Sequence, residues 1–252
     1  MHNLDMTVHP QWENRFSEMQ MAIIAKSLLE LATHSAVLSE MSDLDLYVRD
    51  FMSAIDGGDP SSIEDALLTL YIRLHNAGSQ YSPSEKEILK KRNAYLCHPG
   101  GLSPLIMAEK FIRPESTVAD LGAGNGLQGL LLQRICPHLK TLQIELSSEL
   151  IRIGKIFQEA LGISSGYIEW IHDDIVNVSI ESADFVYIYR PAKPLDSGKE
   201  LYKAIARKLS VGNKSLVIFS VADCLATFLD KRFSVFYTDG HLTCFVKNCN
   251  GF

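Results

Sequence analysis

Residues 118–129 read VADLGAGNGLQG, and this stretch decides the fold of the chain. An apolar run ends in Asp120, and glycine then occupies the alternate positions Gly122, Gly124 and Gly126. Glycine lets the backbone turn sharply and come close to a ligand, where a Cβ atom would collide. Because the helical pattern GLQGLLLQRIC follows at once, the stretch predicts a strand, a tight loop and the start of a helix.

Strand-like and helix-like segments alternate after about residue 115. Strands of a parallel sheet that is covered on both sides are apolar on both faces. Five runs fit that description: TVADLGA (117–123), TLQIEL (141–146), YIEWIHDD (167–174), ADFVYIYR (183–190) and SLVIFSV (215–221). Helical patterns separate them, and another helix is expected at about 222–231. The last segment, FSVFYTDGHLTCFVKN, has two strand-like runs around Asp239-Gly240, a tight-turn dipeptide. The pattern predicts a doubly wound α/β fold, whose mostly parallel seven-strand sheet ends in an antiparallel hairpin.

The first 85 residues have helical periodicity instead. Apolar residues recur at helical spacing in two stripes, from Leu44 to Ile55 and from Ile63 to Leu74. Ser82 and Glu85 have the spacing of a capping box, which predicts a third helix through about Leu96. We therefore expect an N-terminal helical cap or side bundle at 1–85 and a Rossmann-like domain at 86–252.

The composition restricts the compartment and the partners. The chain has 252 residues, of which 46% are hydrophobic, enough for a sizeable core. The net charge is −6 and no basic run occurs, which argues against a nucleic-acid partner. The five cysteines are an odd number without C-x-x-C spacing, as expected of reduced thiols. There is no leader pattern and no apolar run of membrane-spanning length, so we expect a cytoplasmic protein that does not enter a membrane. The oligomeric state is left open.

Two classes of ligand compete for the glycine loop. A dinucleotide-binding oxidoreductase requires G-x-G-x-x-G, and counting from Gly122 puts Leu127 where the last glycine belongs. A carboxylate such as Asp120 would also repel a pyrophosphate, whereas it suits a ligand that carries an ammonium group. The residues therefore favour a D-x-G-x-G-x-G loop that binds a ligand with an ammonium group.

The run DLGAGNG (120–126) resembles the first motif of the class I (seven-strand, Rossmann-like) S-adenosylmethionine-dependent methyltransferases. The resemblance covers roughly residues 90–252 and includes the terminal hairpin, which that family adds to a doubly wound sheet. It implies an enzyme of the EC 2.1.1 class that transfers a methyl group by in-line displacement. The implied cofactor is S-adenosylmethionine, with S-adenosylhomocysteine as product.

The resemblance also implies roles for residues at the strand ends. The loop backbone cradles the methionine part and Asp120 holds its amino group. Glu145 accepts both ribose hydroxyls, and Asp174, in preference to Asp173, accepts from the adenine amino group. The implied cofactor-binding set is Asp120, Gly122, Ala123, Gly124, Gly126, Glu145, Leu146, Asp173, Asp174, Ile175 and Tyr189.

Candidate catalytic residues come from two places. Tyr189 and Arg190 end the fourth strand, and His98 belongs to the segment 93–112, which resembles the stretch that precedes the first motif in the family. Tyr95 and Gly100-Gly101 of that segment are further candidates for contacts to cofactor or substrate. Arg190 or Lys193 is expected to attract an acidic group of the substrate.

Several alternatives remain beside this interpretation. Consecutive strand residues face opposite sides, so His172, Asp173 and Asp174 cannot all reach one ion, and no metal site is predicted.

The run Tyr189-Arg190-Pro191 departs from the Asn/Asp-Pro-Pro-aromatic pattern of enzymes that methylate amino groups of bases or glutamine. The acceptor is thus left open between a small molecule and a protein side chain. A pseudo-enzyme of the same fold, acting as a cofactor-binding or protein-interaction module, is the alternative function.

Overall fold

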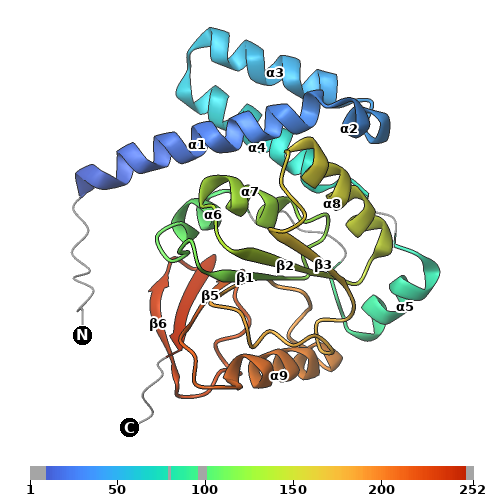
Figure 1. The fold of residues 1–252 in the computed structure, drawn as a ribbon, viewed down its shortest axis with the longest axis vertical. Helices are drawn as coiled ribbons and strands as arrows, with labels where there is room; N and C mark the ends of the chain where they lie inside the picture. Colours follow the sequence, from blue (N-terminus) through green and yellow to red (C-terminus); the bar gives the residue numbers. More distant parts are fainter. Residues whose placement is uncertain (1–9, 79–80, 96–100, 248–252) are drawn as a thin grey trace.

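The computed structural model describes residues 10–78, 81–95 and 101–247, whose strands form one seven-stranded sheet in the order β3-β2-β1-β4-β5-β7-β6 (Figure 1). The first five strands are mutually parallel, β7 is antiparallel to β5, and β6 is antiparallel to β7. The predicted fold class is therefore confirmed. The strands are β1 (Thr117–Leu121), β2 (Lys140–Glu145), β3 (Ile168–His172), β4 (Phe185–Tyr189), β5 (Leu216–Val221), β6 (Phe233–Thr238) and β7 (Leu242–Lys247).

Helices precede the sheet and alternate with its parallel strands. In the described part of the chain they are α1 (Pro10–Thr33), α2 (Ser35–Glu40), α3 (Leu44–Gly57), α4 (Pro60–His75), α5 (Pro83–Lys91), α6 (Ser103–Ala108), α7 (Leu127–Ile135), α8 (Ser148–Ala160) and α9 (Ser197–Ser210). The predicted capping box is present, since Ser82 and Glu85 exchange side-chain and backbone hydrogen bonds at the start of α5. No helix among the described residues has the length and apolar character that crossing a membrane requires.

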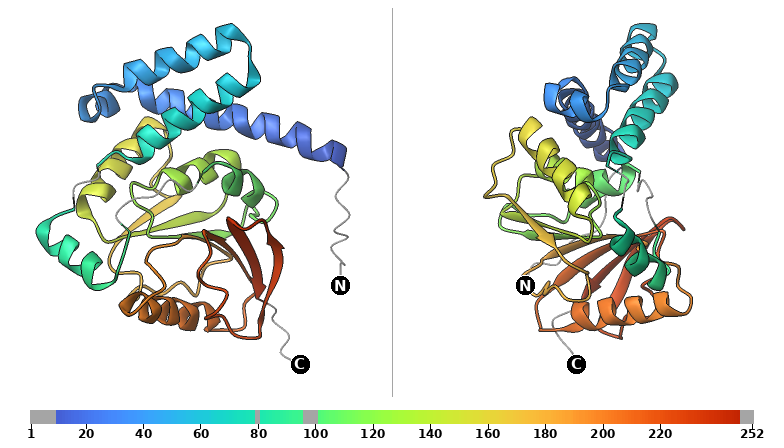
Figure 2. Two further views of the ribbon diagram at one scale, coloured as in Figure 1. Left: turned by 180° about the vertical axis from the view of Figure 1, so that it is seen from behind. Right: turned by 90° about the vertical axis from the view of Figure 1, so that its right-hand side faces the viewer.

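The helices form layers on the two faces of the sheet. α6, α7 and α8 cover one face and α9 covers the other, while α1, α3 and α4 form a further layer beyond α7 and α8 (Figures 1 and 2). A single apolar cluster runs through these layers, from Leu28 and Leu70 in the N-terminal helices to Leu131 in α7 and Phe185 in β4. Burial of apolar surface is the dominant stabilising term in folding. The N-terminal helices therefore share their main stabilisation with the sheet.

Two local expectations differ from the structure. The segment expected to be helical at 222–231 consists of turns: the Asp223 carboxylate accepts from the Leu225 amide at 2.8 Å and the Ala226 amide at 3.3 Å as a helix N-cap would, but only one turn follows, with the Leu229 amide on the Leu225 carbonyl at 3.2 Å. The next turn, in which the Phe233 amide donates to the Asp230 carbonyl at 3.1 Å, already leads into β6. The helix expected to reach about residue 96 ends at Lys91, and Asn93 follows with a positive φ of 53°.

The sheet order creates a switch point between β1 and β4. From β1 the chain builds outward through β2 and β3 on one side, and then through β4 and β5 on the other. Ligands of doubly wound sheets bind beyond the carboxyl ends of the strands at such a point.

Candidate active site

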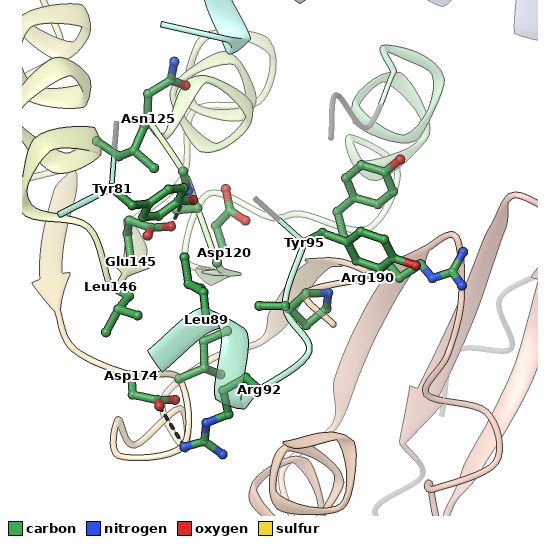
Figure 3. A pocket seen from close by; sticks show the side chains of 18 of the residues that line it. Tyr81, Leu89, Arg92, Tyr95, Asp120, Asn125, Glu145, Leu146, Asp174 and Arg190 are labelled. Atoms are coloured by element: carbon green, nitrogen blue, oxygen red, sulfur yellow. Dashed lines mark hydrogen bonds and ion pairs between the residues drawn. The ribbon is translucent and has the colours of Figure 1, made fainter. Parts of the chain in front are cut away.

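A cavity lies beyond the carboxyl ends of β1, β2 and β4 (Figure 3). Its wall combines the glycine loop and the loop after β3 with the end of α4 and the segment 92–95 that follows α5. The structure brings most of the expected set together, because the lining includes Asp120, Gly122, Ala123, Gly124, Glu145, Leu146, Asp173, Asp174, Ile175, Tyr189, Arg190 and Tyr95.

Three expected residues of the described chain, Gly126, Lys193 and Gly101, are not part of this lining. Gly126 has a φ of 69°, and a Cβ atom on it would stand 2.3 Å from the Trp170 ring. Packing against Trp170, rather than contact with a ligand, accounts for this glycine. Lys193 is exposed and outside the cavity wall. His98 lies outside the described residues, as does Gly100.

Asp120 presents a buried acceptor to the cavity. The residue is 3% exposed, and within the described chain its Oδ2 has no hydrogen-bond partner. Burial, and secondarily the nearby Glu145, raise the pKa of Asp120 to about 7. A buried polar atom without a partner costs free energy, so Asp120 is suited to receive a hydrogen-bonding cation from a ligand.

Glu145 is fixed beside the glycine loop by backbone amides. Its Oε2 accepts from the Gly124 amide and its Oε1 from the Ser147 amide, both at 2.8 Å. Burial raises the pKa of Glu145, and these bonds oppose that rise. Each carboxylate oxygen has two lone pairs. One on each oxygen of Glu145 therefore remains for a pair of neighbouring ligand hydroxyls.

The glycine loop leaves open space on the cavity side. Gly124 has φ at 60° and no heavy atom within 4 Å of where a Cβ would stand; Gly122 has φ at 80°, and the nearest atom is Ile175 Cδ1 at 3.7 Å. The loop is thus shaped for close approach of a ligand to the backbone. Together with Asp120 and Glu145, it fits a nucleoside that bears an amino-acid group.

The loop after β3 separates the two neighbouring aspartates. Asp174 lines the cavity and pairs through Oδ2 with Arg92 Nη2 at 2.8 Å. Asp173 accepts from Asn177 Nδ2 at 2.8 Å, and this bond is the main cause of its lowered pKa. Asp173 is therefore held within its own turn, and Asp174 is the better placed of the two. Arg92 was not foreseen, because nothing in its sequence neighbourhood marks a partner so far along the chain.

The carboxyl end of β4 supplies a cation. Arg190 has φ at 22°, and its Nε is buried with no hydrogen-bond partner in the described structure. Its guanidinium carbon lies 5.3 Å from the centre of the Tyr95 ring (Figure 3). Backbone bonds hold Tyr95 in place, since its amide donates to the Pro191 carbonyl at 3.1 Å and Ala94 forms a bridge with Ala192.

The further lining residues that sequence reasoning missed include His75 of α4, Gln128 of α7 and Tyr187 of β4. Tyr187 lies beside Asp120 in the strand register. Its position two residues before Tyr189 is the one signal that was available, because alternate strand residues share a face. Nothing in the sequence links His75 to the site.

The described residues contain no group of three or more His, Cys, Asp or Glu side chains placed to hold a metal ion.

Comparison with family models and with curated proteins gives no match. Among solved structures, a putative RNA methyltransferase from Pyrococcus horikoshii is 17% identical, with a TM-score of 0.44 over 58% of this chain and 82% of that one. An RNA methyltransferase from Salinibacter ruber, in complex with S-adenosyl-L-homocysteine, is 16% identical, with a TM-score of 0.40 over 67% and 91% of the two chains. A putative rRNA methylase from Clostridium thermocellum is 13% identical, with a TM-score of 0.46 over 57% and 95%. Likeness at these identities concerns the fold alone.

The sheet order, the antiparallel hairpin and the glycine loop after β1 all agree with the resemblance found in the sequence. The chain has a seven-stranded, doubly wound sheet that ends in an antiparallel hairpin, which is the fold that its sequence resemblance to the class I S-adenosylmethionine-dependent methyltransferases implied.

Proposed function

We propose that the protein is an S-adenosylmethionine-dependent methyltransferase. The observation that carries this proposal is the buried Asp120 carboxyl group, whose Oδ2 lacks a partner among the described residues and which lines the same cavity as the open glycine loop. A dinucleotide would bring a pyrophosphate, and no lining residue at the loop offers a cation to it. A cationic amino-acid group on a nucleoside satisfies Asp120 instead.

The bound cofactor supplies an electrophilic methyl group on a sulfonium. The protein's part is to bind, orient and exclude water. Asp120 holds the ammonium group, and Glu145 accepts the ribose hydroxyls with its remaining lone pairs. Asp174 accepts from the adenine amino group, while the apolar Leu146 and Ile175 cover the ring. The acceptor enters on the side of Tyr189, the last residue of β4, and Arg190, which follows it; both line the same cavity.

Arg190 is the residue that we assign to the acceptor. The other arginine of the cavity wall, Arg92, is already paired with Asp174. Arg190 has no carboxylate partner within the described residues, and a guanidinium binds carboxylates and phosphates well. An acceptor with an acidic group close to the methylated atom fits this arrangement.

The class of acceptor includes candidates that the composition argued against. The similar solved structures are a putative RNA methyltransferase, an RNA methyltransferase and a putative rRNA methylase. The net charge of −6 describes the whole chain and not the cavity wall, to which Arg190 contributes. RNA therefore belongs with proteins and small molecules among the acceptors to be tested, and the expectation against nucleic acid is withdrawn.

Calorimetric titration with S-adenosylhomocysteine tests the cofactor. Wild-type protein should bind it, and Asp120→Ala and Glu145→Ala should each weaken binding by at least 10-fold. Glu169→Ala is the matched control, because Glu169 is a half-exposed carboxylate on β3 that pairs with Lys140 away from the cavity. A folded wild-type protein that does not bind the product would overturn the proposal.

A transfer assay then addresses the acceptor. Protein and S-adenosylmethionine with a radiolabelled methyl group are incubated with total RNA, with cell protein and with a small-molecule extract. Loss of macromolecular label on nuclease treatment identifies RNA as the acceptor, and loss on protease treatment identifies protein. Label that appears only in the small-molecule extract identifies a small molecule. Arg190→Gln should reduce transfer while leaving cofactor affinity unchanged, whereas equal transfer by both proteins would remove Arg190 from the acceptor site.

A further inference from the structure

Four side chains form what we call the inner polar pocket: His75, Asp120, Gln128 and Tyr187. All four line the cavity, and they come from α4, β1, α7 and β4. Asp120 and Tyr187 are 3% and 1% exposed and lie side by side in the strand register. Each has an atom without a hydrogen-bond partner in the described structure, Oδ2 of Asp120 and the hydroxyl of Tyr187.

Buried polar atoms without partners are rare, and two neighbouring ones in a cavity wall need a common explanation. The pair differs in chemistry. A carboxylate oxygen accepts, whereas a phenol that burial keeps protonated donates. A ligand that satisfies both atoms must offer a donor and an acceptor a short distance apart.

His75 adds a second donor. Gln128 Nε2 donates to the Tyr71 hydroxyl at 3.1 Å and lies 3.0 Å from His75 Nδ1. Because an amide NH₂ group only donates, Nδ1 accepts and the ring proton of His75 is on Nε2. Gln128 thus positions the imidazole as a hydrogen-bond donor in the cavity wall.

We propose that the inner polar pocket binds the zwitterionic amino-acid end of the cofactor, with Asp120 on the α-ammonium group and with Tyr187 and His75 on the α-carboxylate. This assignment rests on the proposed function. It makes helix α4, which lies outside the segment that resembles the methyltransferase family, a part of the cofactor site. It also gives Gln128 a positioning role.

Tyr187→Phe provides the cleanest test. The variant removes one oxygen that has no partner in the described structure, so the fold loses no hydrogen bond and its thermal stability should stay equal or rise. Affinity for S-adenosylhomocysteine should fall about 10-fold or more, because hydrogen bonds to charged groups are the stronger ones. Tyr167→Phe is the matched control at a surface position that is 49% exposed.

A ligand series separates the two halves of the pocket. Titration with 5′-methylthioadenosine, which lacks the whole amino-acid group, should give the same affinity for wild type, Tyr187→Phe and His75→Ala. S-adenosyl-3-thiopropylamine keeps the ammonium group but lacks the carboxylate. It should be insensitive to Tyr187→Phe and still sensitive to Asp120→Asn.

The outcomes discriminate between the two proposals. If wild-type protein binds S-adenosylhomocysteine but Tyr187→Phe and His75→Ala weaken all three ligands equally or none, the assignment of the inner polar pocket is wrong and the proposed function stands. If folded wild-type protein binds neither S-adenosylhomocysteine nor 5′-methylthioadenosine, both are wrong. Loss confined to the carboxylate-bearing ligand supports the pocket.

Discussion

At the scale of single residues, Asp120 opposes stability, and its proposed role is in binding. Its carboxyl group is taken out of water beside a second buried carboxyl, that of Glu145, and the described residues offer its Oδ2 no hydrogen-bond donor. Ionisation of such a group is unfavourable in the folded state. A protein keeps an arrangement of this kind at functional sites, where a ligand satisfies the group.

The pH dependence of stability should reveal this cost. The pKa of Asp120 rises from 3.8 to about 7 on folding, so its ionisation lowers the unfolding free energy progressively as pH rises from about 4 to 7. A difference of this size corresponds to about 4 kcal/mol. Asp120→Asn should therefore be more stable than wild type at pH 8 and equal to it near pH 4, in urea titrations at both values. Equal stability of the two proteins at pH 8 would contradict the raised pKa.

At the scale of elements, the glycine loop joins a strand and a helix with two different uses of glycine. Gly124 faces open space next to the cavity, whereas Gly126 at the start of α7 is pressed against Trp170. Both have positive φ. Sequence alone assigned both to the ligand, because spacing does not reveal which side of the loop carries a bulky neighbour.

A matched pair of alanine variants separates the two uses. Gly126→Ala places a Cβ 2.3 Å from the Trp170 ring in addition to the backbone strain, so we expect a loss of about 3 kcal/mol or more in unfolding free energy. Gly124→Ala bears the strain alone and should lose about 1 kcal/mol. It should nevertheless lower affinity for S-adenosylhomocysteine, measured by calorimetry. Similar unfolding free energies for the two variants would contradict this division.

The strands, and the start of helix α5, could be predicted because their sequence signals are local. Apolar runs, the Ser82 capping box and the Asp239-Gly240 turn each act within a few residues. The turns after Asp223 were missed because Asp223 does accept as a helix N-cap would, while the chain turns into β6 after a single helical turn, which the apolar pattern does not indicate. The pairing of Arg92 with Asp174, and the approach of His75 to the cavity, depend on packing between distant segments.

At the scale of the whole molecule, Asn125 joins the N-terminal helices to the glycine loop. Its side chain is 1% exposed, and Nδ2 donates to the Leu74 carbonyl at 2.8 Å and the His75 carbonyl at 3.1 Å. These carbonyls belong to the last turn of α4, and the carbonyl groups of a last helical turn have no amide of the same helix four residues further on. A residue of the predicted cofactor motif thus caps a helix some fifty positions earlier in the chain, which spacing within the motif could not indicate.

This contact should couple ligand binding to α4. In hydrogen-exchange mass spectrometry, S-adenosylhomocysteine should slow exchange in the glycine loop and also in residues 60–75 of the wild-type protein. Asn125→Ala should lose about 2–4 kcal/mol of unfolding free energy and most of the slowing in α4. The exposed Asn213, which lies outside the cavity wall, is the control when substituted by alanine. If ligand addition did not change hydrogen exchange in α4 of the wild-type protein, this coupling would be contradicted.

The shared core also affects how the chain folds while it is being synthesised. Helices α1 to α4 leave the ribosome before α7 exists, yet Leu70 and Leu74 of α4 belong to the same apolar cluster as Leu131. At 5–20 residues per second, translating the roughly sixty residues up to the end of α7 takes about 3–12 s. During that interval the nascent helices expose an apolar face without its partner. We therefore expect slowed elongation between residues 76 and 135 to increase aggregation of the nascent chain.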